Sequence, residues 1–277
     1  MIQDIGPSVF HNEYRHIRPR KDDVILMFDS GGAVLCSMSC GRIAFPDIRE
    51  NDDDAVYLFS IDNTGYFLYR GPAVQKPEGY DFYRLRELRS SSSGPEVFAA
   101  FTAYHLWRWY EDNRFCGSCA SPMTEDTKER ALVCTKCGRM VYPRINPAVI
   151  VGVIKDDRLL ITRYNRGYSH DALIAGFAEI GETLEQTVAR EVMEEAGIRV
   201  KNIRYYRSQP WGMAQDLLAG FFCEQDGDDP IRVDDSELAS AVYKSRDQIE
   251  LQSAQLSLTN EMMTVFKEGR AGQELKW

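Results

Sequence analysis

Three glutamates with the spacing of a metal site lie in the second half of the chain, at Glu191, Glu194 and Glu195. In a helix, residues three and four apart share a face, so the three carboxylates would gather on one side. Carboxylates held that close repel one another, and a hard cation such as Mg²⁺ or Mn²⁺ relieves the repulsion because it binds carboxylate and phosphate oxygens. Taken alone, the spacing also fits an acidic helix face exposed to solvent.

The helix that would carry these glutamates has clear start and stop signals. Thr183, followed three residues later by Gln186, has the pattern of a capping box at a helix start. Gly197 is typical of a helix end. Between these signals, apolar residues four apart predict a buried stripe: Leu184, Val188 and Val192. The sequence therefore predicts one amphipathic helix that presents the glutamates.

Four cysteines form two C-x-x-C pairs, Cys116 with Cys119 and Cys134 with Cys137, separated by fourteen residues. Zinc binds four thiolates in a tetrahedron, and each pair supplies two from one tight turn. Four buried or redox-active cysteines are the alternative. A four-thiolate site has no open position, so we predict a structural Zn²⁺ ion and not a catalytic one. The remaining cysteines are predicted to be small buried hydrophobic residues: Cys36, Cys40 and Cys223.

The composition is that of an acidic, soluble globular protein, with 277 residues, 44% hydrophobic, 27% charged and a net charge of -9. This net charge disfavours strong non-specific binding to nucleic-acid phosphates. Met1–Tyr14 lacks the features of a signal peptide, and no apolar run reaches the roughly 18 residues of a membrane-spanning helix. We therefore expect a cytoplasmic protein. Basic residues near the cysteines still allow a local positive patch: Lys128, Arg130, Lys136, Arg139 and Arg144.

The pattern along the chain predicts a multi-domain α+β protein with an N-terminal α+β domain over 1–112, a four-cysteine ribbon over 113–143 and a last domain over 144–277. In the first domain, 24–36 and 56–69 have the pattern of two strands joined by a turn, and Pro95–Asn113 that of a helix. In the last domain we expect a mixed sheet with helices on it. Its strands are predicted near 148–154, 159–162, 217–223 and 241–243, and its final helix near 258–267.

The stretch from Gly176 to Ile198 resembles the Nudix box at every defined position. Five residues separate Gly176 from Glu182, and seven more separate Glu182 from the Arg190-Glu191 pair. The box is completed by the seven residues after Glu191: an aliphatic residue, any residue, two glutamates, any residue, a glycine and an aliphatic residue, which are here Val192 to Ile198. The resemblance implies a Nudix α/β/α sandwich with a loop–helix–loop metal site. It also implies hydrolysis of a nucleoside diphosphate that is linked to a second moiety.

A four-cysteine ribbon directly before such a domain resembles the NADH pyrophosphatase branch of the family, over about residues 97 to 250. That branch carries the motif Ser-Gln-Pro-Trp-Pro-Phe-Pro-x-Ser after the box, and Ser208 to Trp211 match its first four residues. The later prolines, the phenylalanine and the final serine are replaced over Gly212 to Asp216. Because Gly212 and Ala214 stand where the branch has prolines, we expect a looser loop and only a modest preference for NADH over ADP-ribose.

The resemblance implies a role for each candidate site residue. Glu191, Glu194, Glu195 and Glu237 would bind Mg²⁺ or Mn²⁺, and Glu194 or, preferably, Glu195 would deprotonate the attacking water. Arg190 would restrain a carboxylate or bind phosphate. The residues expected to contact substrate are Phe177, Tyr142, Gln209 and Trp211. Phe177 and Tyr142 would stack on a base or the nicotinamide ring, although either could be a core aromatic residue and Trp211 could serve packing alone.

Several functions remain open at this point. The first is hydrolysis of NAD(H)-type dinucleotides to AMP and nicotinamide mononucleotide, and the second is cleavage of the same bond in RNA that carries a 5′ NAD cap. A broader ADP-ribose or nucleoside diphosphate hydrolase is a third. A non-catalytic nucleotide-binding regulator is disfavoured, since it would have no reason to keep three clustered glutamates. The branch also leads us to expect a homodimer.

Overall fold

The structure is a computed structural model that describes residues 1–47, 54–72, 75–89, 91, 94–165, 170–234, 236, 238–252 and 255–271. The chain divides into two units. The C-terminal unit contains Met1 with residues 146–210 and 216–277, and the N-terminal unit contains residues 2–145 and 211–215. The first domain and the ribbon thus belong to one unit, and their division at 112/113 stays a prediction.

A mixed sheet forms the centre of the C-terminal unit. Its strands, in spatial order, are β14 (Arg199–Trp211), β15 (Asp216–Asp226), β11 (Asn146–Lys155), β12 (Arg158–Tyr164) and β16 (Leu238–Lys244), and β13 (Ile174–Phe177) also pairs with β11. β11 runs parallel to β15 and antiparallel to β12 and β13. Because β11 pairs along both edges, it lies in the middle of the sheet and fixes where β13 ends.

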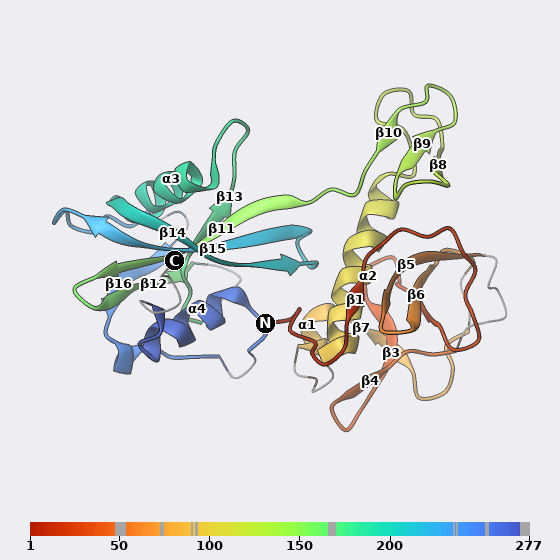
Figure 1. Ribbon diagram of the computed structural model, residues 1–277, viewed down its shortest axis with the longest axis horizontal. Helices are drawn as coiled ribbons and strands as arrows, with labels where there is room; N and C mark the ends of the chain where they lie inside the picture. The colour runs from red at the N-terminus through yellow and green to blue at the C-terminus, as the bar shows by residue number, and fades with distance from the viewer. Residues whose placement is uncertain are drawn as a thin grey trace. The chain divides into compact units, whose positions relative to one another are not determined.

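Two helices cover opposite faces of this sheet, α3 (Leu184–Ala196) and α4 (Leu258–Lys267), as Figure 1 shows. Successive side chains of a strand point to opposite faces, and β11 follows this rule. Val149, Val151 and Val153 join the core beneath α3, whereas Ile150 joins the core beneath α4. Both faces of β11 are therefore buried, and the unit is the α/β/α sandwich that the sequence predicts. A short 3-10 helix, η2 (Arg246–Gln248), follows β16.

The N-terminal unit is built on two small sheets. The first has the order β1 (Phe10–His11), β5 (Ala55–Ile61), β6 (Thr64–Tyr69) and β2 (Val24–Leu26), and the second has the order β4 (Arg42–Ala44), β3 (Val34–Ser39) and β7 (Asp81–Tyr83). They share a hydrophobic core that includes Ile25, Leu35, Tyr57 and Phe67. Asp23 connects the chain before β2 to this core, because its buried carboxylate accepts hydrogen bonds from the Gly65 and Arg20 amides.

The long helix α2 (Gly94–Asp112) packs against this unit and leads into the ribbon; the short helix α1 (Leu85–Leu88) precedes it. Four large side chains of α2 are at most 6% exposed: Phe98, Phe101, Leu106 and Trp109. Beyond α2, the antiparallel strands β8 (Met123–Glu125), β9 (Leu132–Cys134) and β10 (Met140–Val141) form the ribbon (Figure 1). Among the described residues, no helix is both long enough and apolar enough to cross a membrane.

The helices and strands that the sequence predicts are present, but several further strands lie where none was predicted. β14 is thirteen residues long and was not predicted as a strand, because most of its side chains are exposed and show no regular alternation. Cys36 and Cys223 are buried as predicted, but Cys40 is exposed. Its φ of 52° places it in the turn before β4, where no core is available to cover it.

The segment that replaces the proline-rich part of the branch motif is held in place, which contradicts the expectation of a loose loop. The Trp211 ring packs against Phe101 of α2 with the ring centroids 5.5 Å apart. Gln215 is only 5% exposed, and its side-chain carbonyl accepts a hydrogen bond from the Arg144 guanidinium. Trp211 to Gln215 belong to the N-terminal unit.

We predict that Gly212→Ala destabilises the N-terminal unit by about 1–3 kcal/mol, the usual cost of forcing an extra methyl group into a packed site. A Cβ atom built on Gly212 would overlap the backbone carbonyl oxygen of Phe101, which cannot move without distorting α2. Chemical unfolding followed by tryptophan fluorescence measures the change. Gly94→Ala is the control, because a Cβ at Gly94 meets nothing within 4 Å. Equal stability of both variants would contradict the prediction.

Candidate functional site

The glutamate helix begins and ends where the sequence predicts. The Thr183 hydroxyl accepts a hydrogen bond from the Gln186 amide at 3.2 Å, and the Gln186 side chain accepts one from the Thr183 amide at 2.8 Å. At the other end, Gly197 has a φ of 67° and donates its N–H to the Met193 carbonyl. A left-handed residue costs least as glycine, so the helix stops there. Both ends of α3 are thus set by local chemistry.

Arg190 connects the helix to the loop before it. Its guanidinium donates to Glu182 at 2.7 and 2.9 Å, to Glu191 at 2.7 Å and to Glu194 at 2.9 Å. It also donates to the backbone carbonyl of Phe177, the last residue of β13, at 2.9 Å. Of the two roles expected for Arg190, the structure shows the restraint of carboxylates.

Glu182 is the main ion-pair partner of Arg190. The hydrogen bond from Arg190 lowers the pKa of Glu182 to about 2, even though desolvation opposes the shift. The buried Thr187 hydroxyl adds a further hydrogen bond to Glu182 at 2.9 Å. Glu182 therefore stays charged at neutral pH and holds the loop against the helix. Sequence reasoning gave Glu182 no role, and its defined position in the Nudix box was the signal available.

The three predicted metal-binding glutamates differ in their surroundings. Glu191 is 9% exposed and Glu195 only 2%, whereas the Glu194 side chain is 57% exposed. Among the described residues, only the four cysteines form a group of three or more His, Cys, Asp or Glu whose ligand atoms lie within 4.8 Å of one another. The three glutamate carboxylates therefore do not all lie within 4.8 Å of one another, although Glu191 and Glu194 share a donor on Arg190. Glu237, the fourth predicted ligand, lies outside the described residues.

Gly176 provides the space in which the Glu191 carboxylate lies. A Cβ atom built on Gly176 would overlap the carboxyl carbon and both oxygens of Glu191. The first glycine of the box thus lets a carboxylate of α3 lie directly on the backbone of β13. A buried carboxylate requires a compensating cation or hydrogen bonds, and carboxylate oxygens are the ligands that Mg²⁺ and Mn²⁺ prefer. The two buried glutamates and their cradle therefore fit a hard divalent cation.

The predicted substrate contacts fall into two groups. Phe177 and Tyr142 are 53% and 54% exposed, so neither is a core aromatic residue. The Tyr142 hydroxyl donates to Glu129 at 2.8 Å. Phe177 lies in the C-terminal unit and Tyr142 in the N-terminal unit.

Gln209 and Trp211 instead have structural surroundings. Gln209 is fully buried; its amide nitrogen donates to the Leu256 carbonyl at 2.7 Å and its amide oxygen accepts from the Leu258 N–H at 2.7 Å. Both ends of the amide thus hold the start of α4, which argues against the predicted contact with substrate. Trp211 packs against Phe101, as described above, and the Arg89 guanidinium lies 5.6 Å from its ring centroid.

The four cysteines come together as predicted. Their sulfur atoms lie within 4.8 Å of one another, with Cys116 3.7 Å from Cys137 and Cys119 3.4 Å from Cys134. They come from two turns, one before β8 and the other after β9. Four thiol sulfurs at this spacing fit a tetrahedral Zn²⁺ site with no open position.

Backbone amides favour thiolate at these turns. The Cys137 and Lys136 N–H groups donate to the Cys134 sulfur at 3.4 Å and lower the pKa of Cys134 to about 6. The Ser118 N–H lowers the pKa of Cys116 in the same way. Although the Arg139 amide favours the Cys137 thiolate, the neighbouring sulfurs raise the pKa of Cys137 to about 11. Four thiolates cannot coexist here without a cation, which is the charge balance that zinc supplies.

The basic residues near the cysteines are exposed, except for Arg130. Arg130 is half-buried and donates to the Asn12 side chain at 2.7 Å and to the Leu58 carbonyl, so it fastens the ribbon to the first sheet of its own unit. Arg139 donates to the Ser118 hydroxyl. The exposed lysines of the predicted patch are Lys128 and Lys136.

Two family models match the sequence of this chain. The NUDIX domain family matches residues 144–263, and the NADH pyrophosphatase zinc ribbon domain matches residues 111–142. A Klebsiella pneumoniae subsp. pneumoniae protein named NAD-capped RNA hydrolase NudC is 39% identical over 179 residues, which cover 64% of this chain and 69% of that protein. The chain belongs to the Nudix family. A Shigella flexneri protein of the same name is 43% identical over 179 residues, with the same coverage.

The Nudix assignment agrees with the observed fold. The crystal structure of a Nudix hydrolase from Nitrosomonas europaea aligns with a TM-score of 0.50 at 21% identity, covering 57% of this chain and 93% of that one. At that identity the likeness concerns the fold alone. Within this Nudix fold, β13, the loop after it and α3 carry the box residues described above.

We predict that purified protein holds one zinc ion per chain and that Cys134→Ser lowers this content. Structural zinc contributes its binding energy to folding, so the substitution should also lower the midpoint of thermal unfolding. Elemental analysis of protein prepared without chelator measures the ion. Cys40→Ser is the matched control, because Cys40 is exposed and lies outside the quartet. Zinc-free wild-type protein of normal stability would show that the quartet has another role.

A second prediction concerns the glycine cradle. If Glu191 binds the catalytic cation, Gly176→Ala should weaken Mn²⁺ binding by about 10- to 100-fold, the range seen when residues that orient a ligand are changed. The added methyl group would displace the Glu191 carboxylate. Calorimetric titration with Mn²⁺ gives the affinity, with Gly94→Ala as the control and circular dichroism to verify folding. Unchanged affinity in a folded Gly176→Ala protein would remove Glu191 from the proposed ligand set.

Proposed function

We propose that this protein hydrolyses the pyrophosphate bond of NAD(H)-type dinucleotides and releases AMP and nicotinamide mononucleotide. The observation that carries the proposal is the arrangement of α3: two buried glutamates, one lying in the Gly176 cradle, with Arg190 ordering the carboxylates around them. The zinc ribbon directly before the Nudix domain supports the choice of dinucleotide, since the matching ribbon family is described as that of NADH pyrophosphatase.

In this proposal each carboxylate has a separate task. Glu191, Glu194 and Glu195 would hold Mg²⁺ or Mn²⁺, which would supply positive charge beside the phosphate oxygens. Glu195, which is almost fully buried, accepts the proton of the water that attacks one phosphorus. The bond from phosphorus to the bridging oxygen breaks, so that one phosphate leaves on each mononucleotide.

Arg190 and Phe177 position the reacting groups. One guanidinium nitrogen of Arg190 holds both Glu191 and Glu194, so the two carboxylates keep a fixed separation. The exposed ring of Phe177 follows directly after the cradle on β13 and is available to stack on a base or nicotinamide ring. Tyr142 is equally exposed and is proposed for the same kind of contact.

A second candidate substrate is RNA with a 5′ NAD cap. The relatives from Klebsiella pneumoniae and Shigella flexneri carry the name NAD-capped RNA hydrolase, and the bond to be cut is the same. Lys128 and Lys136 leave exposed positive charge on the ribbon, although the net charge of -9 opposes long-range attraction of RNA. The choice of Mg²⁺ or Mn²⁺, the cytoplasmic location and the homodimer stay predictions.

We predict that the wild-type protein converts NADH to AMP and reduced nicotinamide mononucleotide, and that Glu195→Gln lowers kcat by about 100-fold or more. The substitution keeps the size of the side chain but removes the charge that a base or a cation ligand requires. Product analysis by chromatography, with NADH, NAD⁺, ADP-ribose and NAD-capped RNA under one metal condition, tests the reaction and ranks the substrates by kcat/KM.

Glu185→Gln is the matched control for this experiment, because Glu185 lies exposed in the first turn of the same helix. It should retain the wild-type rate. A folded Glu195→Gln protein with the wild-type rate would refute the assignment of Glu195. If the wild-type protein cuts ADP-ribose far better than any NAD-type substrate, the proposed substrate is wrong, but the proposed mechanism still holds.

A further inference from the structure

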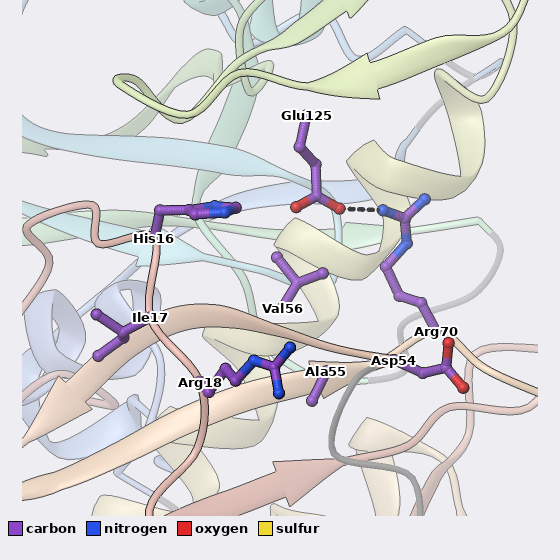
Figure 2. A pocket seen from close by; sticks show the side chains of 8 residues that line it. All are labelled: His16, Ile17, Arg18, Asp54, Ala55, Val56, Arg70 and Glu125. Atoms are coloured by element: carbon purple, nitrogen blue, oxygen red, sulfur yellow. Dashed lines mark hydrogen bonds and ion pairs between the residues drawn. The ribbon is translucent and has the colours of Figure 1, made fainter.

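Among the described residues of the N-terminal unit, two of the cavities differ in the charge of their linings. The larger, about 630 Å³, is lined by residues of the first sheet, the ribbon and the segment before β2 (Figure 2). There Arg70 is paired with Glu125 at 2.5 Å, and Asp54 adds another carboxylate. With His16 and Arg18 the charges of this lining are mixed, so it offers no strong preference for an anion.

The smaller cavity, about 340 Å³, has a positive lining. It is formed by Gly31, Gly32, Arg84, Leu85, Arg86, Tyr104 and Met213, so the described residues that line it include two arginines and no acidic side chain. Both arginines are exposed. Two carboxylates that are close in sequence to the lining accept hydrogen bonds from backbone amides: Asp29 from the Gly31 and Ala33 N–H groups at 2.9 and 2.8 Å, and Glu87 from the Arg84 N–H at 2.8 Å.

One wall of this cavity is rigid and aromatic. Gly32 has a φ of 80°, and a Cβ atom there would lie 2.6 Å from the Tyr104 ring and 3.0 Å from the Trp107 ring. Phe28 stacks on Trp107 with the centroids 5.3 Å apart, and Tyr104 lies 5.4 Å from Trp107. The backbone of the glycine turn is therefore packed onto an aromatic cluster that fixes Tyr104 at the cavity wall. Only glycine fits this turn, so its shape is determined by the packing.

We propose that the smaller cavity binds a nucleoside 5′-phosphate unit, with Arg84 and Arg86 on the phosphate and Tyr104 and Met213 against the base. Guanidinium groups donate paired hydrogen bonds to phosphate oxygens. Aromatic rings and thioethers provide an apolar contact surface for any nucleobase. The volume lies within the usual range of small-ligand sites. The choice of a nucleotide, over another organic phosphate, rests on the proposed function, because AMP is its product and an RNA chain belongs to its second substrate.

The test measures binding of two probes to the full-length protein: free AMP by calorimetry, and an uncapped single-stranded oligoribonucleotide by fluorescence anisotropy, without added Mg²⁺ or Mn²⁺. Arg84→Gln combined with Arg86→Gln should weaken binding at least tenfold, since each lost charged hydrogen bond is worth roughly that factor or more. The matched control combines Arg15→Gln with Arg42→Gln, which removes the same charge from exposed positions of the same unit outside the cavity.

Each outcome has one meaning. Weaker AMP binding in the cavity variant, relative to the control variant, supports a site for the free mononucleotide, and weaker oligoribonucleotide binding supports a site for the RNA chain. If the two variants bind both probes equally, the proposal is overturned. Hydrolysis of NADH by the wild-type protein is measured in parallel; failure of that reaction would refute the proposed function without changing the outcome of the binding comparison.

Discussion

The candidate site depends on one side chain, the guanidinium of Arg190. Its nitrogens hold a carboxylate of the preceding loop, two carboxylates of α3 and the last backbone carbonyl of β13. A guanidinium stays charged at all ordinary pH values and has a fixed fork of donors, so these partners keep fixed relative positions. A lysine could supply the charge but not this geometry. Strand, loop and helix are thereby assembled into one unit around the acidic groups.

The same site shows how buried charge and close packing are combined. Glu191 and Glu195 are one helical turn apart and almost fully covered, a placement that requires compensation from neighbouring groups. For Glu191 the compensation comes from Arg190 and the space comes from Gly176, whose missing side chain leaves room for the carboxylate. The glycine of the box thus provides space for the Glu191 carboxylate, and the arginine of the box balances its charge. Neither role follows from the chemistry of a glycine or an arginine considered alone.

Local signals predicted α3 and the zinc ribbon well. The ends of α3 were predictable because Thr183, Gln186 and Gly197 act on the backbone within a few residues of themselves. The cysteine quartet was predictable because two tight turns need only their own sequence to present four sulfurs. By contrast, β14 has few buried side chains, so the alternation that identifies a strand is missing.

The roles of Gly176 and Gln209 depend on contacts with residues distant in sequence, which spacing does not encode. Gln209 illustrates the limit of carrying a motif over by position alone. It matches the branch motif, yet both ends of its amide serve the start of α4, so a motif residue can be kept for folding as well as for binding.

The altered part of the branch motif is best explained by packing. This chain has Gly212 where the branch has a proline. A Cβ atom at this position would overlap the carbonyl oxygen of Phe101. A proline at this position would meet the same carbonyl, so the substitution fits the path of the backbone beside α2. The entropy that glycine adds to the unfolded chain is offset by contacts in the folded state, since Trp211 packs on Phe101 and Gln215 is bound by Arg144. Loss of the prolines therefore does not imply loss of order, and the modest preference for NADH over ADP-ribose stays a prediction.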